Sequence, residues 1–195
     1  MSDVMIPVGN GQMAQWQKLV NDAEELNGVR LDEELESYLV FTLMRFTQRP
    51  EMAARIMALD YLDAMLQAGS ISHEQMRDVG DQCLLLAGLF PDRAQKRRVK
   101  VSYYVDLGRS AYRHLAESLV NMTTLYRHLA TQFIPAMDTL QAIRVLGDQQ
   151  ALDPMMAFDL WNDTGSTQAG ACLALATGVK PVRMGIAGGG FDTKH

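Results

Sequence analysis

The sequence contains little that marks the common catalytic and binding chemistries. Its 195 residues include two cysteines, four histidines and six prolines, and aromatic residues make up 7%. Cys83 and Cys172 lie far apart, each inside an apolar stretch, so they do not form the cysteine framework of a disulfide-rich protein. We expect both to be small core residues of a protein that works in a reducing compartment.

Long hydrophobic runs and a targeting signal are also missing. The longest uncharged apolar stretches, 83–90 and 169–179, are well short of the roughly 18 residues that a membrane-spanning helix needs. The first residues are acidic, and no apolar block follows them as it does in a secretory signal. The sequence therefore predicts a soluble, cytoplasmic protein without a transmembrane segment.

Motifs for metals and cofactors are absent as well. A helical di-iron site needs a carboxylate three residues before a histidine, and only His195, preceded by Asp192, meets that requirement. Neither His-Glu-x-x-His nor Cys-x-x-Cys occurs. The glycine-rich stretch 185–190 lacks the Lys-Ser/Thr pair of a phosphate-binding loop. We expect no metal, no cofactor and no catalytic residue, and the sequence favours a protein that is not an enzyme.

The overall composition is that of a folded, acidic protein. Hydrophobic residues make up 48% and charged residues 21%, which excludes a wholly disordered chain. The net charge is −5 and the pI is about 5.3, so the chain as a whole is not a nucleic-acid binder. Methionine is unusually frequent, with 13 residues that fall mostly on apolar helical faces. They either fill the core or line a groove for a partner.

Apolar residues recur every three or four positions along most of the chain, as they do on one face of a helix. The predicted helices are 12–26, 32–49, 50–67, 72–89, 103–119, 123–146 with a break at Pro135, 154–161 and 166–177. Capping residues mark several of their starts, at Asp32, Ser72 with Gln75, Ser102 and Asp153. No segment sustains the alternation of a strand. The sequence predicts an all-α, single-domain bundle of about seven to nine helices over 1–178, followed by an irregular Gly-rich tail over 179–195.

One short motif occurs twice. The pentapeptide 112–116, Tyr-Arg-His-Leu-Ala, is repeated at 126–130, but the flanking residues do not match. The echo is either a coincidence between two amphipathic helices or a pair of similar Tyr/Arg/His edges that face one partner or ligand. It is too short to be a structural repeat.

A basic patch interrupts the acidic chain. It consists of Arg93, Lys96, Arg97, Arg98 and Lys100. The patch is either a solvated loop or a surface for phosphates, an acidic partner or an anionic membrane. No aromatic residue lies within it to stack on bases, so nucleic acid is the less favoured partner.

The helices predicted at 72–89 and 103–119 carry the candidate ligand-binding residues. These are Asp81, Tyr104, Arg109 and Tyr112. Asp81 stands among apolar residues, so we expect it to be partly buried and paired with a cation from the basic patch or with Arg109. This pair either fixes the local structure or takes part in catalysis.

Gly108 lies in the middle of the second of these helices, where glycine costs about 1 kcal/mol relative to alanine. Its small size permits either a tight helix crossing or a pocket for a small apolar or anionic ligand. In the second case Tyr104 and Tyr112 line the pocket, and Arg109 anchors an anion.

The same region resembles a family of uncharacterised bacterial helical proteins. The shared pattern consists of Gly80-Asp81, Ala87-Gly88-Leu89-Phe90-Pro91, Tyr103-Tyr104, and Gly108 with Ala111-Tyr112. It covers about a fifth of the chain. The resemblance implies a bacterial, cytosolic protein and transfers no activity, cofactor or catalytic residue.

Three functions are compatible with these features. The favoured hypothesis is a non-enzymatic binding or regulatory protein that acts through protein–protein contacts, as a homodimer or with another protein. Its interaction element would be the apolar segment 155–161, which either the domain itself or a second subunit must cover. The alternatives are a small-molecule sensor or enzyme with a pocket between helices 72–89 and 103–119, and an electrostatic binder of nucleic acid or an anionic surface through 93–100.

Overall fold

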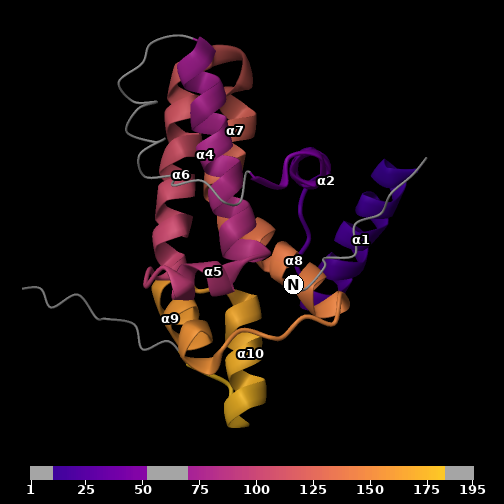
Figure 1. Cartoon of the computed structure of the whole chain (residues 1–195), viewed down its shortest axis with the longest axis vertical. Coiled ribbons are helices and arrows are strands. Elements are labelled where there is room, and N and C mark those ends of the chain that lie inside the picture. The colour runs from indigo at the N-terminus through magenta and orange to yellow at the C-terminus, as the bar shows by residue number, and fades with distance from the viewer. Residues whose placement is uncertain (1–10, 52–69, 183–195) are drawn as a thin grey trace, which may run out of the picture.

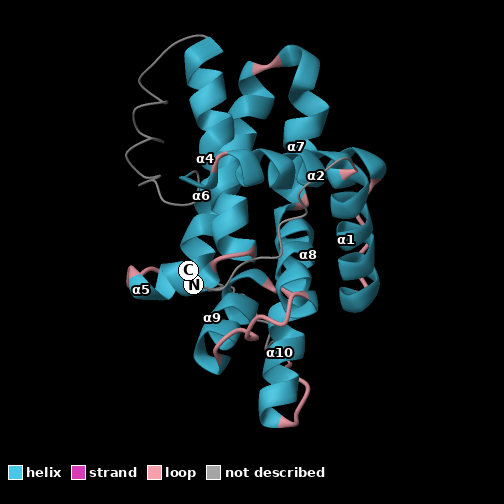
Figure 2. Ribbon diagram, turned by 45° about the vertical axis from the view of Figure 1, so that its right-hand side comes forward, coloured by secondary structure: helices cyan, strands magenta, loops and turns pink. Residues whose placement is uncertain are grey.

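The computed structural model describes residues 11–51 and 70–182, which form an all-α fold (Figure 1). Within these residues there are nine α-helices and no strand (Figure 2), and short 3-10 segments occur at 50–51 and 120–122. The α-helices are α1 Gln12–Asn27, α2 Glu33–Gln48, α4 Ser70–Gly88, α5 Pro91–Lys96, α6 Val101–Ser118, α7 Thr123–Thr131, α8 Phe133–Leu146, α9 Pro154–Thr164 and α10 Thr167–Thr177, and the 3-10 helix Val120–Met122 precedes α7. The predicted fold class is confirmed. The predicted helix over 50–67 lies almost wholly outside the described residues, as do 183–195 of the predicted tail.

Several predicted helix starts are confirmed because their caps are local. The Asp32 carboxylate accepts a hydrogen bond from the backbone N–H of Leu35, and Asp153 does the same for Met155 and Met156 at the start of α9. The predicted helix over 123–146 is divided at Gln132 into α7 and α8, three residues before Pro135.

Two predicted caps are wrong. Helix α4 already begins at Ser70, so Ser72 lies inside it rather than at its cap. Helix α6 begins at Val101, and the hydroxyl of Ser102 donates to Asp163 of α9, at 2.9 Å. A tertiary contact has therefore replaced the local cap that the sequence predicts at Ser102.

Part of the basic patch is helical rather than a loop. Helix α5 covers 91–96, with Pro91 in its first turn and Ala94 buried beneath it. Proline is well suited to the first turn of a helix, because the missing N–H has no intrahelical partner there. The alternative of a solvated loop across 93–100 is thus wrong for the first half of that segment.

Helix α4 lies at the centre of the fold. Every residue from Val79 to Leu89 is buried, and α2, α6 and α8 lie around this half of the helix. Helices α4 and α6 run side by side (Figures 1 and 2). A helix that is buried on all sides belongs to the middle of a core, so any polar residue on it must find partners inside the protein.

Two glycines allow α4 and α6 to approach closely. A Cβ added to Gly80 would lie 2.5 Å from the ring of Tyr112, and one added to Gly108 would lie 2.5 Å from Phe133 and 2.8 Å from Cys83. Side chains therefore fill the space that each glycine leaves. At both positions the geometry is that of a tight crossing, which for Gly108 is one of the two alternatives that the sequence left open.

Helices α9 and α10 pack on one another at one end of the bundle, and α10 projects beyond the other helices (Figure 1). Trp161 of α9 lies against Gly170 of α10, and Pro181 is close to the same glycine. The chain after α10 therefore turns back along that helix. None of the helices in the described ranges is long and apolar enough to cross a membrane.

Candidate functional site

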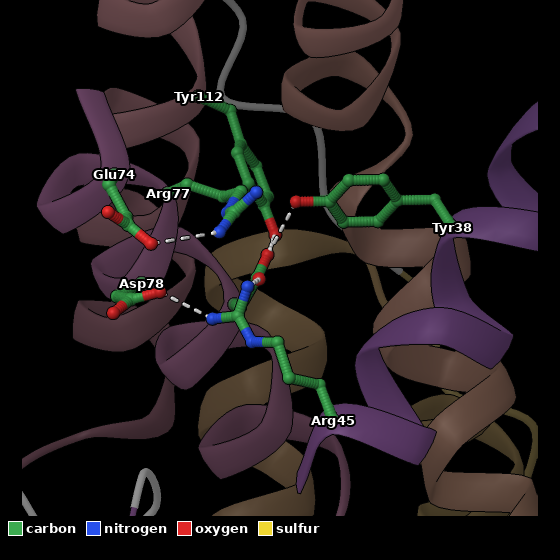
Figure 3. Close-up of polar contacts among 7 residues, drawn as sticks. Tyr38, Arg45, Glu74, Arg77, Asp78 and Tyr112 are labelled. Atoms are coloured by element: carbon green, nitrogen blue, oxygen red, sulfur yellow. Dashed lines mark hydrogen bonds and ion pairs between the residues drawn. The ribbon is translucent and has the colours of Figure 1, made fainter. Parts of the chain in front are cut away.

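Asp81 is the most deeply buried carboxylate of α4, with 1% of its surface exposed. The hydroxyls of Tyr38 (α2) and Tyr112 (α6) both donate to its Oδ1, each at 2.7 Å. A guanidinium nitrogen of Arg45 (α2) lies 3.2 Å from its Oδ2. Figure 3 shows the Tyr38, Arg45 and Tyr112 side chains converging from three directions. Three helices thus meet at one carboxylate.

The Asp81 cluster, defined as Asp81, Tyr38, Arg45 and Tyr112, continues along α4. Arg45 also pairs with Asp78, which lies about one turn before Asp81. A buried charge without partners would be strongly destabilising, and here both carboxylate oxygens have donors. The arrangement therefore satisfies the electrostatic demands of a core carboxylate.

Burial controls the protonation of this cluster. It raises the pKa of Asp81, although Arg45 and the two tyrosine hydroxyls offset part of the effect. Burial and the nearby Asp81 raise the pKa of Tyr38 and Tyr112 well above the usual tyrosine value. Burial by itself would lower the pKa of Arg45, but the negative charges of Asp81 and Asp78 raise it by more, so the net pKa of Arg45 is raised. The tyrosines consequently remain hydrogen-bond donors and Arg45 remains a cation.

An aromatic layer surrounds the cluster. The Tyr112 ring meets Tyr38 edge-on, with centroids 6.3 Å apart, and stacks on Tyr126 at 6.2 Å. Tyr112 and Tyr126 are the first residues of the two copies of the repeated pentapeptide, and the burial pattern of both copies is the same. Tyrosine, leucine and alanine are buried in each copy, while arginine is exposed. The repeated pentapeptide therefore belongs to two amphipathic helices, α6 and α7, that pack on each other.

The structure brings only part of the predicted ligand set together. Asp81 and Tyr112 are in contact, whereas Nε of Arg109 donates to the backbone carbonyl of Ala130 at 3.0 Å. Tyr104 is buried, and its ring packs against Tyr103. The expected cation partner of Asp81 is corrected, because it is Arg45 rather than Arg109 or a residue of the basic patch.

Sequence reasoning missed Tyr38 and Arg45 as partners of Asp81. The two residues are seven positions apart, so they lie on the same face of α2. That face also carries the buried Thr42. The available signal was a stripe of polar residues on α2, a helix that is otherwise apolar over a wide arc. This stripe does not indicate which carboxylate its residues contact.

The basic patch does not form one continuous cationic surface. Lys100 lies 3.5 Å from both Asp159 and Asp163, and the Arg93 guanidinium stands 4.4 Å from the centroid of the Phe90 ring. Lys96, Arg97 and Arg98 are exposed at the end of α5. Electrostatic binding through 93–100 stays a prediction.

Two pockets on the described surface lie near residues discussed above. One, of about 330 Å³, lies between α2 and α4 beside the Asp81 cluster. The other, of about 250 Å³, lies between the chain around Arg98 to Ser102 and the start of α9. Among the described residues no group of three or more His, Cys, Asp or Glu side chains is placed to hold a metal ion.

Comparison with known proteins adds no relative. No family model, no curated protein and no solved structure matches this chain. The resemblance to a bacterial helical family therefore stays a prediction, and function has to be argued from the geometry.

Proposed function

We propose that this protein is a non-enzymatic helical binding protein that acts through protein–protein contacts, with a second copy of the chain as its partner. The observation that carries the proposal is the surface of α10. This helix contains no charged residue, and its only buried residues are Ala169, Gly170 and Leu173. Leu175 is 87% exposed. A helix that is apolar on its outer side as well needs something to cover it.

Helix α9, which packs on α10, carries further exposed apolar residues. Ala157 and Leu160 face the core, so the domain covers one side of the segment predicted as the interaction element. Met155 and Phe158 on the other side are 70% and 46% exposed. Single exposed apolar residues are ordinary, but a group on two packed helices is typical of an interface.

A second copy is the occupant that the charge distribution favours. The chain carries a net charge of −5, so two copies repel each other across most of their surfaces. Helix α10 carries no charged residue, so it does not contribute to this repulsion. A symmetric contact places the same patch of each subunit against the other, so no complementary partner surface is needed.

The absence of a disulfide between the two cysteines of the described chain is consistent with a cytoplasmic location for this dimer. Cys83 and Cys172 form no disulfide, and burial raises the pKa of the Cys83 thiol. A thiol of that kind is unreactive and behaves as a small core residue. A reducing compartment suits such a chain.

The experiment compares two substitutions of the same chemical kind by size-exclusion chromatography with light scattering. Leu175→Glu should convert a dimer of about 43 kDa, twice the 21.7 kDa of the chain, into a monomer, because it buries an unpaired charge at the contact. Val120→Glu is the matched control, since Val120 is also 87% exposed but belongs to the 3-10 helix before α7. It should remain a dimer, and circular dichroism should show unchanged helix content in both.

Two results would contradict the proposal. Wild-type protein that stays at about 22 kDa across the micromolar range would exclude the homodimer. A dimer that survives Leu175→Glu and dissociates with Val120→Glu would place the interface away from α10.

A further inference from the structure

We draw no further inference here: the strongest candidate, the pocket of about 250 Å³ between residues 98–102 and the start of α9, carries nothing because two cations and two carboxylates line it, Lys100 is paired with Asp159 and Asp163, and nothing in the described part of the chain shows what fills it.

Discussion

The carboxylate of Asp81 joins three helices through single hydrogen bonds and one ion pair. Tyr38 and Arg45 reach it from α2 and Tyr112 from α6, while Asp81 itself belongs to the fully buried half of α4. Removing a partner from such a cluster leaves donors or a charge unsatisfied in the core, and the loss is typically about 3 kcal/mol or more for a charge. At the residue scale this cluster fixes how α2 sits on α4.

The first prediction concerns the pH dependence of Asp81→Asn. Because burial raises the pKa of Asp81, the folded protein binds this proton more tightly than the unfolded chain does. The contribution of Asp81 to the free energy of unfolding is therefore greatest below about pH 4 and declines as the pH rises through the native pKa. We expect urea unfolding to show a larger advantage of wild type over Asp81→Asn at about pH 4 than at pH 7.

The opposite pH dependence would show that the ion pair with Arg45 lowers the pKa of Asp81 by more than burial raises it. In that case the advantage of the wild type would grow between pH 4 and pH 7. Tyr38→Phe serves as a control, because it removes one hydrogen bond of the same carboxylate, worth about 1 kcal/mol, without removing a carboxyl group.

The second prediction concerns Gly108→Ala. Alanine is the better helix former, yet its Cβ would overlap the ring of Phe133 and the Cβ of Cys83. We expect overpacking to dominate and the free energy of unfolding to fall by about 1–3 kcal/mol in urea titrations.

Gly147→Ala is the matched control. A Cβ at Gly147 would lie 3.5 Å from the backbone oxygen of Ile143, at an ordinary van der Waals distance, and the Gly147 φ of −87° suits alanine. Stability should change by no more than about 0.5 kcal/mol. Equal effects at the two glycines would show that the crossing of α4 and α6 is not tight.

At the scale of elements, α10 is held in place by an acidic residue of α8. The Oδ2 atom of Asp138 accepts hydrogen bonds from the backbone N–H and the hydroxyl of Thr167, both at 2.9 Å, and Oδ1 accepts from Ser166. The Ser166 hydroxyl in turn accepts from the N–H of Ala169 and caps the helix. Asp138 thus determines the position from which α10 projects.

The third prediction follows from this contact. Asp138→Ala leaves the buried hydroxyl of Ser166 and the partly buried donors of Thr167 without their acceptor, so the free energy of unfolding should fall by about 2–4 kcal/mol. Hydrogen exchange in α10 should accelerate more than in α4. Asp153→Ala removes an exposed cap of α9 and should cost only about 1 kcal/mol. Unchanged exchange in α10 of Asp138→Ala would contradict this role of Asp138.

The elements were predictable from the sequence where their signals are local. The three/four spacing of apolar residues identifies α1 and α6, because the residues of each helix themselves define its packing face. The caps at Asp32 and Asp153 could be recognised for the same reason. Ser102 could not be interpreted correctly, because its hydroxyl is bound by Asp163, a residue of another helix.

The candidate site was less predictable because its contacts are distant along the chain. The burial of Asp81 followed from its apolar neighbours on α4. Its partners Tyr38 and Arg45 belong to α2, and nothing in the sequence reveals that α2 crosses α4 at this level. The pocket beside them depends on the same crossing, so the sequence directed attention to α4 and α6 instead.

At the scale of the whole molecule, charge and apolar surface are separated. The net charge of −5 resides outside α10, and five of the 18 Lys and Arg residues form the basic patch near α5, where Lys100 is paired with acidic residues of α9. A dimer formed through α10 buries no charge of that helix. Raising the salt concentration screens the repulsion between the two acidic subunits and should not dissociate them. Electrostatic binding through the basic patch would show the opposite dependence on salt.

The mass of the wild-type protein in solution tests the central claim most directly. Sedimentation equilibrium across the micromolar range, at low and high salt, should give about 43 kDa, twice the 21.7 kDa of one chain, at both salt concentrations. A mass of about 22 kDa at every concentration would contradict the account, and so would a dimer that dissociates when salt is added.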